Sequence, residues 1–427
     1  MNNIMQLSAN DKITLNGLIE NLPIDYEKAA IETKVFLRAR KIKTPMDLMH
    51  LVLMFSGLDM VLREIAGNFS LINERISDTA IQQRLEACAP WLKMVLEQMW
   101  FADIRKIPGN LRIILIDGSS LSVPGAKGTS YRLHLAIDLV RLSIVHIEVT
   151  DKHVGESLKH YKLQEGDVLV VDRGYNHPKE IIAVSSQGVL ITLRLNPNSM
   201  RLYEVGGGKK INVFNELKNA KTDQIYFQVW SADKTKGYVD AWIHARRLPE
   251  ALRAEAKRKY RLNSKSKNIK QETLIYVEWK IIITTVPIDI LDTDTVMELY
   301  SLRWQVELFI KRLKSLLDID KLRSKEESAL NVVYIYGKLL FTTLLMKRTD
   351  ATFNVSNIGT DPEKSRDITP WRFWKMIRDE MKSIILVASS WKKENHLVAV
   401  EVMKERPRKR KLQTLPLKIQ NLINRFG

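Results

Sequence analysis

Two short aliphatic runs, each ending in an aspartate, constrain the fold of this chain more than any other feature. They are IILID at residues 113–117 and VLVVD at residues 168–172. Aliphatic runs of this length, bounded by turn residues, are typical of buried strands. Asp117 and Asp172 would then be held rigidly at a sheet edge, although aspartate also ends many strands simply because it suits turns.

The segment around these runs, residues 106–196, has the pattern of an α/β core. Further strands are predicted at residues 132–137 and 144–149, and a helix around residues 156–163. Asn176 can cap another helix that has Pro178 in its first turn. Strands and helices mixed in this order favour an α/β or α+β core.

The N-terminal region, residues 1–105, is predicted to be helical. Apolar residues recur there at steps of three and four, and Ser77 or Asp78 can cap one of the helices. Two helices joined near residues 67–70 would form a DNA-binding helix-turn-helix. An ordinary helical bundle explains the same pattern equally well.

The remaining chain divides into three predicted parts. Residues 197–286 are predicted to be a β-rich insertion, with candidate strands at 210–214, 224–230, 239–245 and 274–284. Helices follow, as a second part of the core at 287–345 and as a basic C-terminal region at 346–427. Two basic stretches, 253–270 and 404–411, are either solvated faces or surfaces that grip DNA.

Charge and cysteine content narrow the function classes. Lys and Arg total 67 against 49 acids, which gives a net charge of +18 and favours a polyanionic partner. The single cysteine, Cys88, excludes an internal disulfide and a thiolate zinc cluster. The most apolar stretch, residues 332–346, is shorter than the ~20 residues of a membrane span. We therefore expect a cytoplasmic protein without a membrane segment.

A polar stripe along a predicted helix at residues 300–314 is the most specific signal. Tyr300, Arg303, Glu307 and Lys314 fall within about 60° of one another on a helical wheel, along about 21 Å of helix. An i, i+4 ion pair explains only Arg303 and Glu307. Trp304 lies off the stripe and is interpreted as a packing residue. The apolar residues centre on another face: Val306, Phe309, Ile310, Leu313, Leu316 and Leu317.

The spacing Y-x2-R-x3-E-x6-K resembles the signature of bacterial insertion-sequence transposases of the "insertion sequence four" type, which belong to the RNase H-like DDE superfamily. Asp117-Gly118 resembles the first acidic position of that family, and Asp172-Arg173-Gly174-Tyr175 resembles the second. Glu307 takes the third. The resemblance covers residues 110–325 and implies an RNase H-like core interrupted by a β-rich insertion.

The resemblance implies that Asp117, Asp172 and Glu307 are catalytic metal ligands. In such sites two Mg²⁺ ions, about 3.5–4 Å apart, stabilise the attacking and leaving oxygens of an in-line phosphoryl displacement. Mn²⁺ can substitute for Mg²⁺. The neighbouring acids Glu148, Asp151 and Glu156 are interpreted as surface residues or as supports of the ligands.

The resemblance also implies DNA contacts. Tyr300, Arg303 and Lys314 would contact phosphates near the transposon end. Trp279 would stack on a flipped base, or is simply a core tryptophan. Arg194 would also reach DNA.

The expected function is therefore DNA transposition. The enzyme would bind terminal inverted repeats, cut there and join the ends to target DNA, as a homodimer in a synaptic complex. Whether cutting passes through a hairpin stays open. The alternatives are a Mg²⁺-dependent nuclease on the same fold and a non-catalytic DNA-binding derivative.

Overall fold

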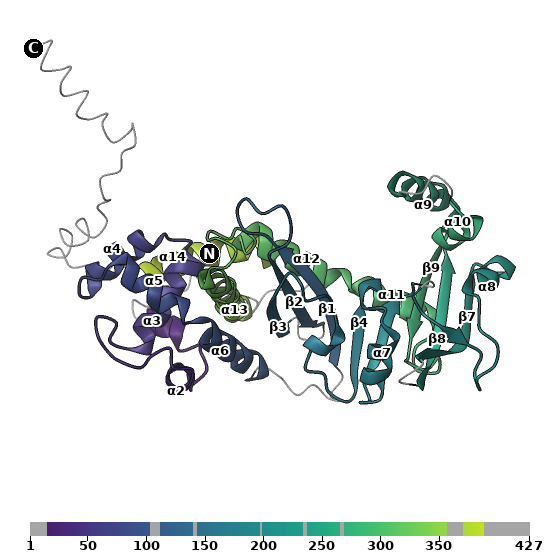
Figure 1. Ribbon diagram of the computed structural model, residues 1–427, viewed down its shortest axis with the longest axis horizontal. Coiled ribbons are helices and arrows are strands. Elements are labelled where there is room, and N and C mark those ends of the chain that lie inside the picture. Colours follow the sequence, from purple (N-terminus) through teal and green to yellow (C-terminus); the bar gives the residue numbers. More distant parts are fainter. Residues whose placement is uncertain are drawn as a thin grey trace, which may run out of the picture. The chain divides into compact units, whose positions relative to one another are not determined.

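The computed structural model describes residues 15–102, 112–139, 143–196, 199–233, 237–264, 269–356 and 370–387 (Figure 1). The chain forms two compact units, one of Glu97–Glu326 and one of Met1–Leu96 with Glu327–Gly427. The first unit is built on a mixed sheet and the second is helical, so the predicted α/β class is confirmed and is consistent with an RNase H-like fold. The predicted boundary at 345/346 falls within helix α13, Ala329–Ser356.

One nine-stranded sheet runs through the first unit, in the order β3-β2-β1-β4-β5-β9-β8-β7-β6. Strands β1, β4 and β5 are parallel, and the other neighbours pair antiparallel. The strands are β1 Arg112–Leu121, β2 Tyr131–Asp138, β3 Ser143–Asp151, β4 Asp167–Val171, β5 Leu190–Arg194, β6 Leu202–Tyr203, β7 Gln224–Asp233, β8 Gly237–Arg247 and β9 Trp279–Thr284.

The parallel pairing of β1 and β4 ends before the two aspartates. The last pair in register is Leu115 with Val170, so Asp117 and Asp172 each lie two residues further along adjacent strands. The expected strand end at Asp117 is wrong, because β2 continues to pair with β1 as far as Leu121. Asp172 does follow the last residue of β4 and begins a short 3₁₀ turn.

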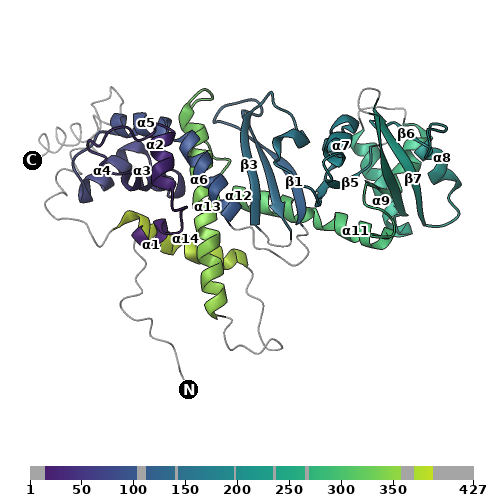
Figure 2. The same ribbon diagram turned by 90° about the horizontal axis from the view of Figure 1, so that it is seen from below.

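Helices cover both faces of this sheet. On one face, α7 (Pro178–Ser185) packs onto a core that Ile114, Ile116 and strands β4 to β9 share. On the other face, α11 (Thr293–Leu302) and α12 (Trp304–Leu317) run along the sheet, as Figure 2 shows, and α12 packs on β1 and β2. The catalytic candidates on β1 and α12 thus face each other.

The β-rich insertion is continuous with the core sheet, because β9 pairs with both β8 and β5. Its described residues also include the helices α8 Val213–Asn219, α9 Glu250–Asn263 and α10 Gln271–Val277. The predicted strand at 210–214 is therefore wrong, because Lys210 forms only a single bridge with Tyr203 and α8 begins at Val213. The predicted strand at 274–284 is a strand only from Trp279. The basic stretch forms α9, which has no buried residue. Its residues 265–268, like the run at 404–411, lie outside the described residues.

Two local predictions in the core are also corrected. The helix expected at 156–163 is only a 3₁₀ turn, Leu158–His160. Asn176 does not cap α7, whose N-cap is His177, because the Asn176 amide instead donates to the Arg194 carbonyl at 3.2 Å.

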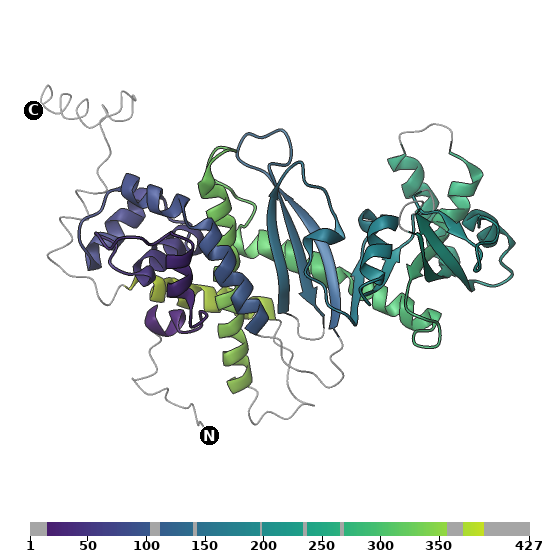
Figure 3. The same ribbon diagram turned by 60° about the horizontal axis from the view of Figure 1, so that its bottom comes forward.

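The helical unit is formed by the N-terminal and the C-terminal segments of the chain. Its helices, shown in Figure 3, are α1 Leu15–Ile19, α2 Tyr26–Glu32, α3 Pro45–Val52, the π-helical turn η2 Leu53–Gly57, α4 Leu62–Ile72, α5 Asp78–Glu86, the first half of α6 Ala89–Ala102, α13 and α14 Pro370–Leu386. A Cβ at Gly57 would lie 2.6 Å from the Phe341 ring, so glycine permits η2 to approach α13 closely.

Helix α13 is the core helix of this unit. Its segment Ala329–Lys347 is long and apolar enough to cross a membrane by length and composition, and 83% of it is buried within the protein. The sequence also predicted that two helices are joined near residues 67–70, but α4 runs unbroken through these residues. The expected joint there is wrong: α4 and α5 are joined by residues 73–77, and the Ser77 hydroxyl accepts from the Ala80 amide at 3.2 Å.

Candidate active site

The three predicted acids lie around one edge of the parallel strands. Asp117 and Asp172 reach it from β1 and from the end of β4. Glu307 belongs to the first turn of α12. Helices α11 and α12 are joined at Arg303 by two short-range bonds, Arg303 N to Tyr300 O and Val306 N to Arg303 O, both at 3.2 Å. Arg303 keeps helical dihedral angles, so Tyr300 on α11 stays in line with Glu307 and Lys314 on α12, as the predicted polar stripe requires.

The buried side of α12 explains why the stripe faces the acids. Five of the six predicted apolar residues are fully buried: Val306, Phe309, Ile310, Leu313 and Leu317. Leu316 is half-buried. The packing of these residues orients the polar flank toward β1, where the Lys314 ammonium donates to the Ser120 carbonyl at 3.1 Å.

Asp117 and Glu307 line the same cavity of about 550 Å³. It follows α12 from the acids toward the C-terminal end of the helix. The other lining residues are Ile310, Lys311, Lys314, Ser315, Asp318, Asp320 and Lys321. The cavity therefore has carboxylates at both ends and lysines along its length.

Arg303 and Tyr300 form hydrogen bonds to the carboxylates of Glu307 and Asp172, respectively. The Arg303 guanidinium donates to Glu307 Oε1 at 2.6 Å, and the Arg303 side chain is 14% exposed. The Tyr300 hydroxyl donates to Asp172 Oδ1 at 3.3 Å. Burial raises the pKa of Tyr300 to about 12, so its hydroxyl stays protonated and is a donor. These contacts are internal, and Tyr300, 8% exposed, is poorly placed to contact DNA.

Ionisation of Asp117 is costly in this environment. The pKa of its carboxyl is raised from 3.8 to about 6, mainly by burial and to a smaller extent by the charges of Glu307 and Glu156. The Gly118 amide, which donates to Asp117 Oδ1 at 2.9 Å, and the Arg303 charge oppose the increase. A cation bound beside Asp117 would remove this cost.

The donor set suits a hard divalent cation, because carboxylate oxygens are the ligands that Mg²⁺ prefers. Within the described residues, however, no three His, Cys, Asp or Glu side chains converge closely enough to hold a metal ion. Arg303 supplies the positive charge beside Glu307 instead. A three-carboxylate site would therefore need the acids to lie closer together than they do here.

Two predicted aromatic roles do not fit the structure. Trp279 is only 2% exposed and belongs to the sheet core, with the Arg247 guanidinium 4.9 Å from its ring centre. Its ring is thus covered by the protein, which favours the core position over the alternative of stacking on a flipped base. Trp304, interpreted as a packing residue, is instead 59% exposed.

Two further basic residues lie beside Tyr300. Arg194 is exposed at the end of β5, and its charge acts on the Tyr300 hydroxyl. Lys280 was missed in the sequence: its ammonium lies 5.3 Å from the Tyr300 ring centre and donates to the Met297 carbonyl at 3.1 Å. The sequence feature that could have revealed Lys280 is that it is a single lysine within the apolar run WKIIIT of β9.

The raised pKa of Asp117 predicts a pH-dependent stability. Between about pH 4 and 6 the folded protein holds a proton that the unfolded chain releases, so this contribution to stability is present below pH 4 and lost as the pH rises through 6. Asp117→Asn, neutral at every pH, should therefore stabilise the metal-free protein by about 2 kcal/mol at pH 7.5 and hardly at pH 4. Urea unfolding in EDTA measures this, with Asp289→Asn at an exposed acid as control. An equal effect at both pH values would contradict the assignment.

Comparison with known proteins identifies the family. The sequence profile described as "Transposase DDE domain" matches residues 108–342. The chain is 26% identical over 335 residues to the transposase for insertion sequence element IS421 of Escherichia coli, covering 76% of this chain and 90% of that protein. It is 25% identical over 239 residues to the transposase for insertion sequence element IS231F of Bacillus thuringiensis subsp. israelensis, covering 51% of this chain and 48% of that protein. The predicted resemblance to insertion-sequence DDE transposases is thereby confirmed, while its narrower assignment to the "insertion sequence four" type stays a prediction. The chain belongs to the Transposase DDE domain family and is an enzyme that acts on DNA.

Proposed function

We propose that this transposase cuts DNA at the terminal inverted repeats of an insertion sequence and joins the freed ends to target DNA. The observation that carries the proposal is the register of β1 and β4, which brings Asp117 and Asp172 to one sheet edge opposite Glu307. Three carboxylates from two strands and a helix are a suitable ligand set for phosphoryl transfer assisted by two divalent ions.

Asp117, Asp172 and Glu307 would hold Mg²⁺, or Mn²⁺ in its place. When bound, these ions activate the oxygen nucleophile, water or a DNA 3′-hydroxyl, and stabilise the leaving oxygen. The Tyr300 hydroxyl orients the Asp172 carboxylate. Arg303 pairs with Glu307 until that carboxylate is used, and its guanidinium is then available for a phosphate.

Lysines on α12 and in the segment just after it continue the site as a path for the DNA backbone. Lys311, Lys314 and Lys321 line the cavity that begins at Asp117 and Glu307. Arg194 and Lys280 add positive charge beside Tyr300. Lysines spaced along a groove suit successive phosphates of one strand.

Recognition of the DNA ends is assigned to the helical unit. A cavity of about 490 Å³ lies beside the first turns of α5, and it is lined by four basic residues, Arg40, Lys41, Arg75 and Arg84. Gln83, an exposed residue of α5, lines it as well. Basic residues would hold phosphates here, and glutamine is a residue type that reads base edges.

The three acids should be required for chemistry and not for binding. Asp117→Asn, Asp172→Asn and Glu307→Gln should each abolish strand cleavage in Mg²⁺, since each removes a metal-binding charge, while affinity for end DNA changes by less than about threefold. Cleavage of labelled end DNA and fluorescence anisotropy measure the two properties. Robust cleavage by any of the three variants would remove that acid from the site.

A joining assay separates transposition from hydrolysis alone. End DNA with free 3′-hydroxyls, incubated with a supercoiled plasmid and Mg²⁺, should give covalently inserted product. The Mg²⁺-dependent nuclease alternative predicts nicked or linear plasmid without insertion. A non-catalytic DNA-binding derivative predicts unaltered plasmid.

Lys314→Ala should weaken DNA binding through the loss of one phosphate contact. The slope of log affinity against log salt should fall by about one unit. Lys28→Ala, a change of the same charge on α2, is the control, because Lys28 pairs with Glu32 at 3.7 Å on the exposed surface of the helical unit. Equal slopes for the wild type and Lys314→Ala would show that Lys314 contacts no phosphate.

Point substitutions in the α5 cavity test end recognition better than deletion of residues 1–105, which would unfold the unit they share with α13. Arg75→Ala should weaken binding to end DNA and random DNA by the same factor. Gln83→Ala should weaken only end binding, by about 10-fold. Competition anisotropy measures both, and unchanged binding in both variants would place recognition elsewhere.

A further inference from the structure

The connection between β3 and β4, residues 152–166, brings a fourth carboxylate to the catalytic edge. A Cβ built on Gly118 would lie 3.1 Å from Glu156 Oε1, and one built on Gly174 would overlap Glu156 Oε2. Gly118 directly follows Asp117, and Gly174 lies two residues after Asp172. The Glu156 carboxylate therefore fills the space between the two segments that carry the catalytic aspartates.

Neither glycine is explained by its backbone conformation. The described glycines with a positive φ are Gly125, Gly166, Gly188, Gly206, Gly207 and Gly237. Gly118 and Gly174 have dihedral angles open to any residue, so their requirement is spatial. Glycine at both positions admits Glu156, which explains the DG and DRG sequences that follow the acids.

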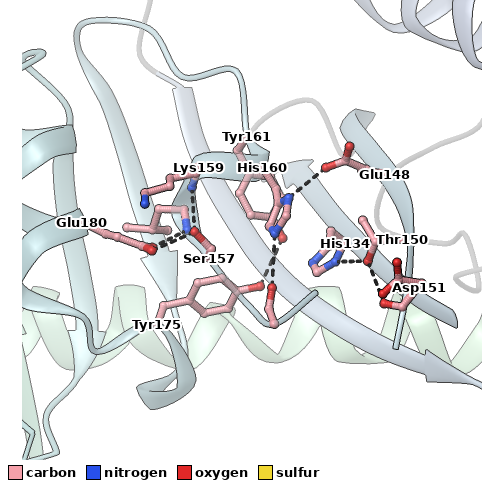
Figure 4. A network of polar contacts seen from close by, with 12 residues as sticks. His134, Glu148, Thr150, Asp151, Ser157, Lys159, His160, Tyr161, Tyr175 and Glu180 are labelled. Atoms are coloured by element: carbon pink, nitrogen blue, oxygen red, sulfur yellow. Dashed lines mark hydrogen bonds and ion pairs between the residues drawn. The ribbon is translucent and has the colours of Figure 1, made fainter. Parts of the chain in front are cut away.

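The residues after Glu156 are fixed to helix α7, as Figure 4 shows. The Ser157 hydroxyl donates to Glu180 Oε1 and the Leu158 amide donates to Glu180 Oε2, both at 2.7 Å. Leu158 is also buried, at 1% exposed. One glutamate of α7 thus holds two consecutive residues of the connection.

The residues before Glu156 are fixed to the sheet through His160. Its ring lies between Gly155 O, 3.2 Å from Nε2, and Glu148 Oε2 of β3, 2.9 Å from Nδ1. The same ring stacks on buried His134 of β2 at 4.3 Å between ring centres (Figure 4). Glu156 is therefore held on both sides by contacts that do not involve its own carboxylate.

The Glu156 carboxylate itself forms no hydrogen bond or ion pair with the residues that the structure describes. A half-buried carboxylate that is rigidly held and lacks a counter-charge costs stability unless a cation approaches. Its position beside the Asp117 and Asp172 segments is where such a cation is expected under the proposed function.

We propose that Glu156 is a positioning residue of the catalytic site, which spaces the Asp117 and Asp172 segments and adds a negative charge that strengthens divalent-cation binding by those aspartates. This inference rests on the proposed function. It differs from a packing role, because glutamine would fill the same space without the charge. It develops the interpretation of Glu156 as a support of the metal ligands.

Glu156→Gln in the full chain separates charge from shape. Mn²⁺ binding without DNA, followed by electron paramagnetic resonance, should weaken about 10-fold, the usual scale for the loss of a residue that supports metal ligands. The Mg²⁺ concentration for half-maximal cleavage should rise by a similar factor. Affinity for end DNA should not change, and without metal the variant should melt no lower than the wild type, because glutamine removes the uncompensated charge. Glu165→Gln, the same charge change in the same connection, is the matched control and should bind Mn²⁺ as the wild type does.

Gly174→Ala tests the spacing, since its methyl group displaces the Glu156 carboxylate. Mn²⁺ affinity should fall as in Glu156→Ala, and the Glu156→Ala/Gly174→Ala double variant should be no weaker than Glu156→Ala alone, because coupled sites are non-additive. Mn²⁺ binding by Glu156→Gln equal to the wild type overturns the inference while leaving the proposed function intact. A wild-type chain that neither binds Mn²⁺ nor cleaves DNA overturns both.

Discussion

The mutual repulsion of carboxylates at one sheet edge is the constraint on which the site depends. The register of β1 and β4 fixes Asp117 and Asp172 side by side, and the packing of α12 brings Glu307 opposite. Burial already makes Asp117 costly to ionise. Without added cations the fold must neutralise these charges with its own side chains, and the polar flank of α12 does so.

Arg303 and Tyr300 therefore have a structural role before any role in DNA binding. Arg303 offsets the charge of Glu307, and Tyr300 satisfies Asp172 through its protonated hydroxyl. A guanidinium that leaves Glu307 for a phosphate exchanges one charge-assisted contact for another. Under the proposed function, binding of DNA and assembly of the three acids would therefore be coupled through the Arg303 side chain.

The sequence predicted those features that depend on residues near one another in the chain. Strands β1 and β4 follow from aliphatic runs, although β1 continues past Asp117 to Leu121. The shared face of Glu307 and Lys314 follows from helical periodicity. The sequence failed where tertiary contacts decide. Trp279 is buried because β9 lies between β5 and β8, and residues 271–277 form a helix although they lead into a strand. The role of Lys280 required knowing that β9 passes beside Tyr300.

Gly118 and Gly174, which follow the two aspartates, also could not be interpreted from the sequence alone. Their letters were visible in the sequence, yet nothing local explained them, because neither has the positive φ that glycine commonly serves. Their explanation is a side chain 38 residues from Gly118 and 18 residues from Gly174, held by α7 and by β3. Gly118 and Gly174 leave room for Glu156, and this relation becomes visible only in the folded structure. The space that Gly118 and Gly174 leave for Glu156 therefore belongs to the proposed site together with its three acids.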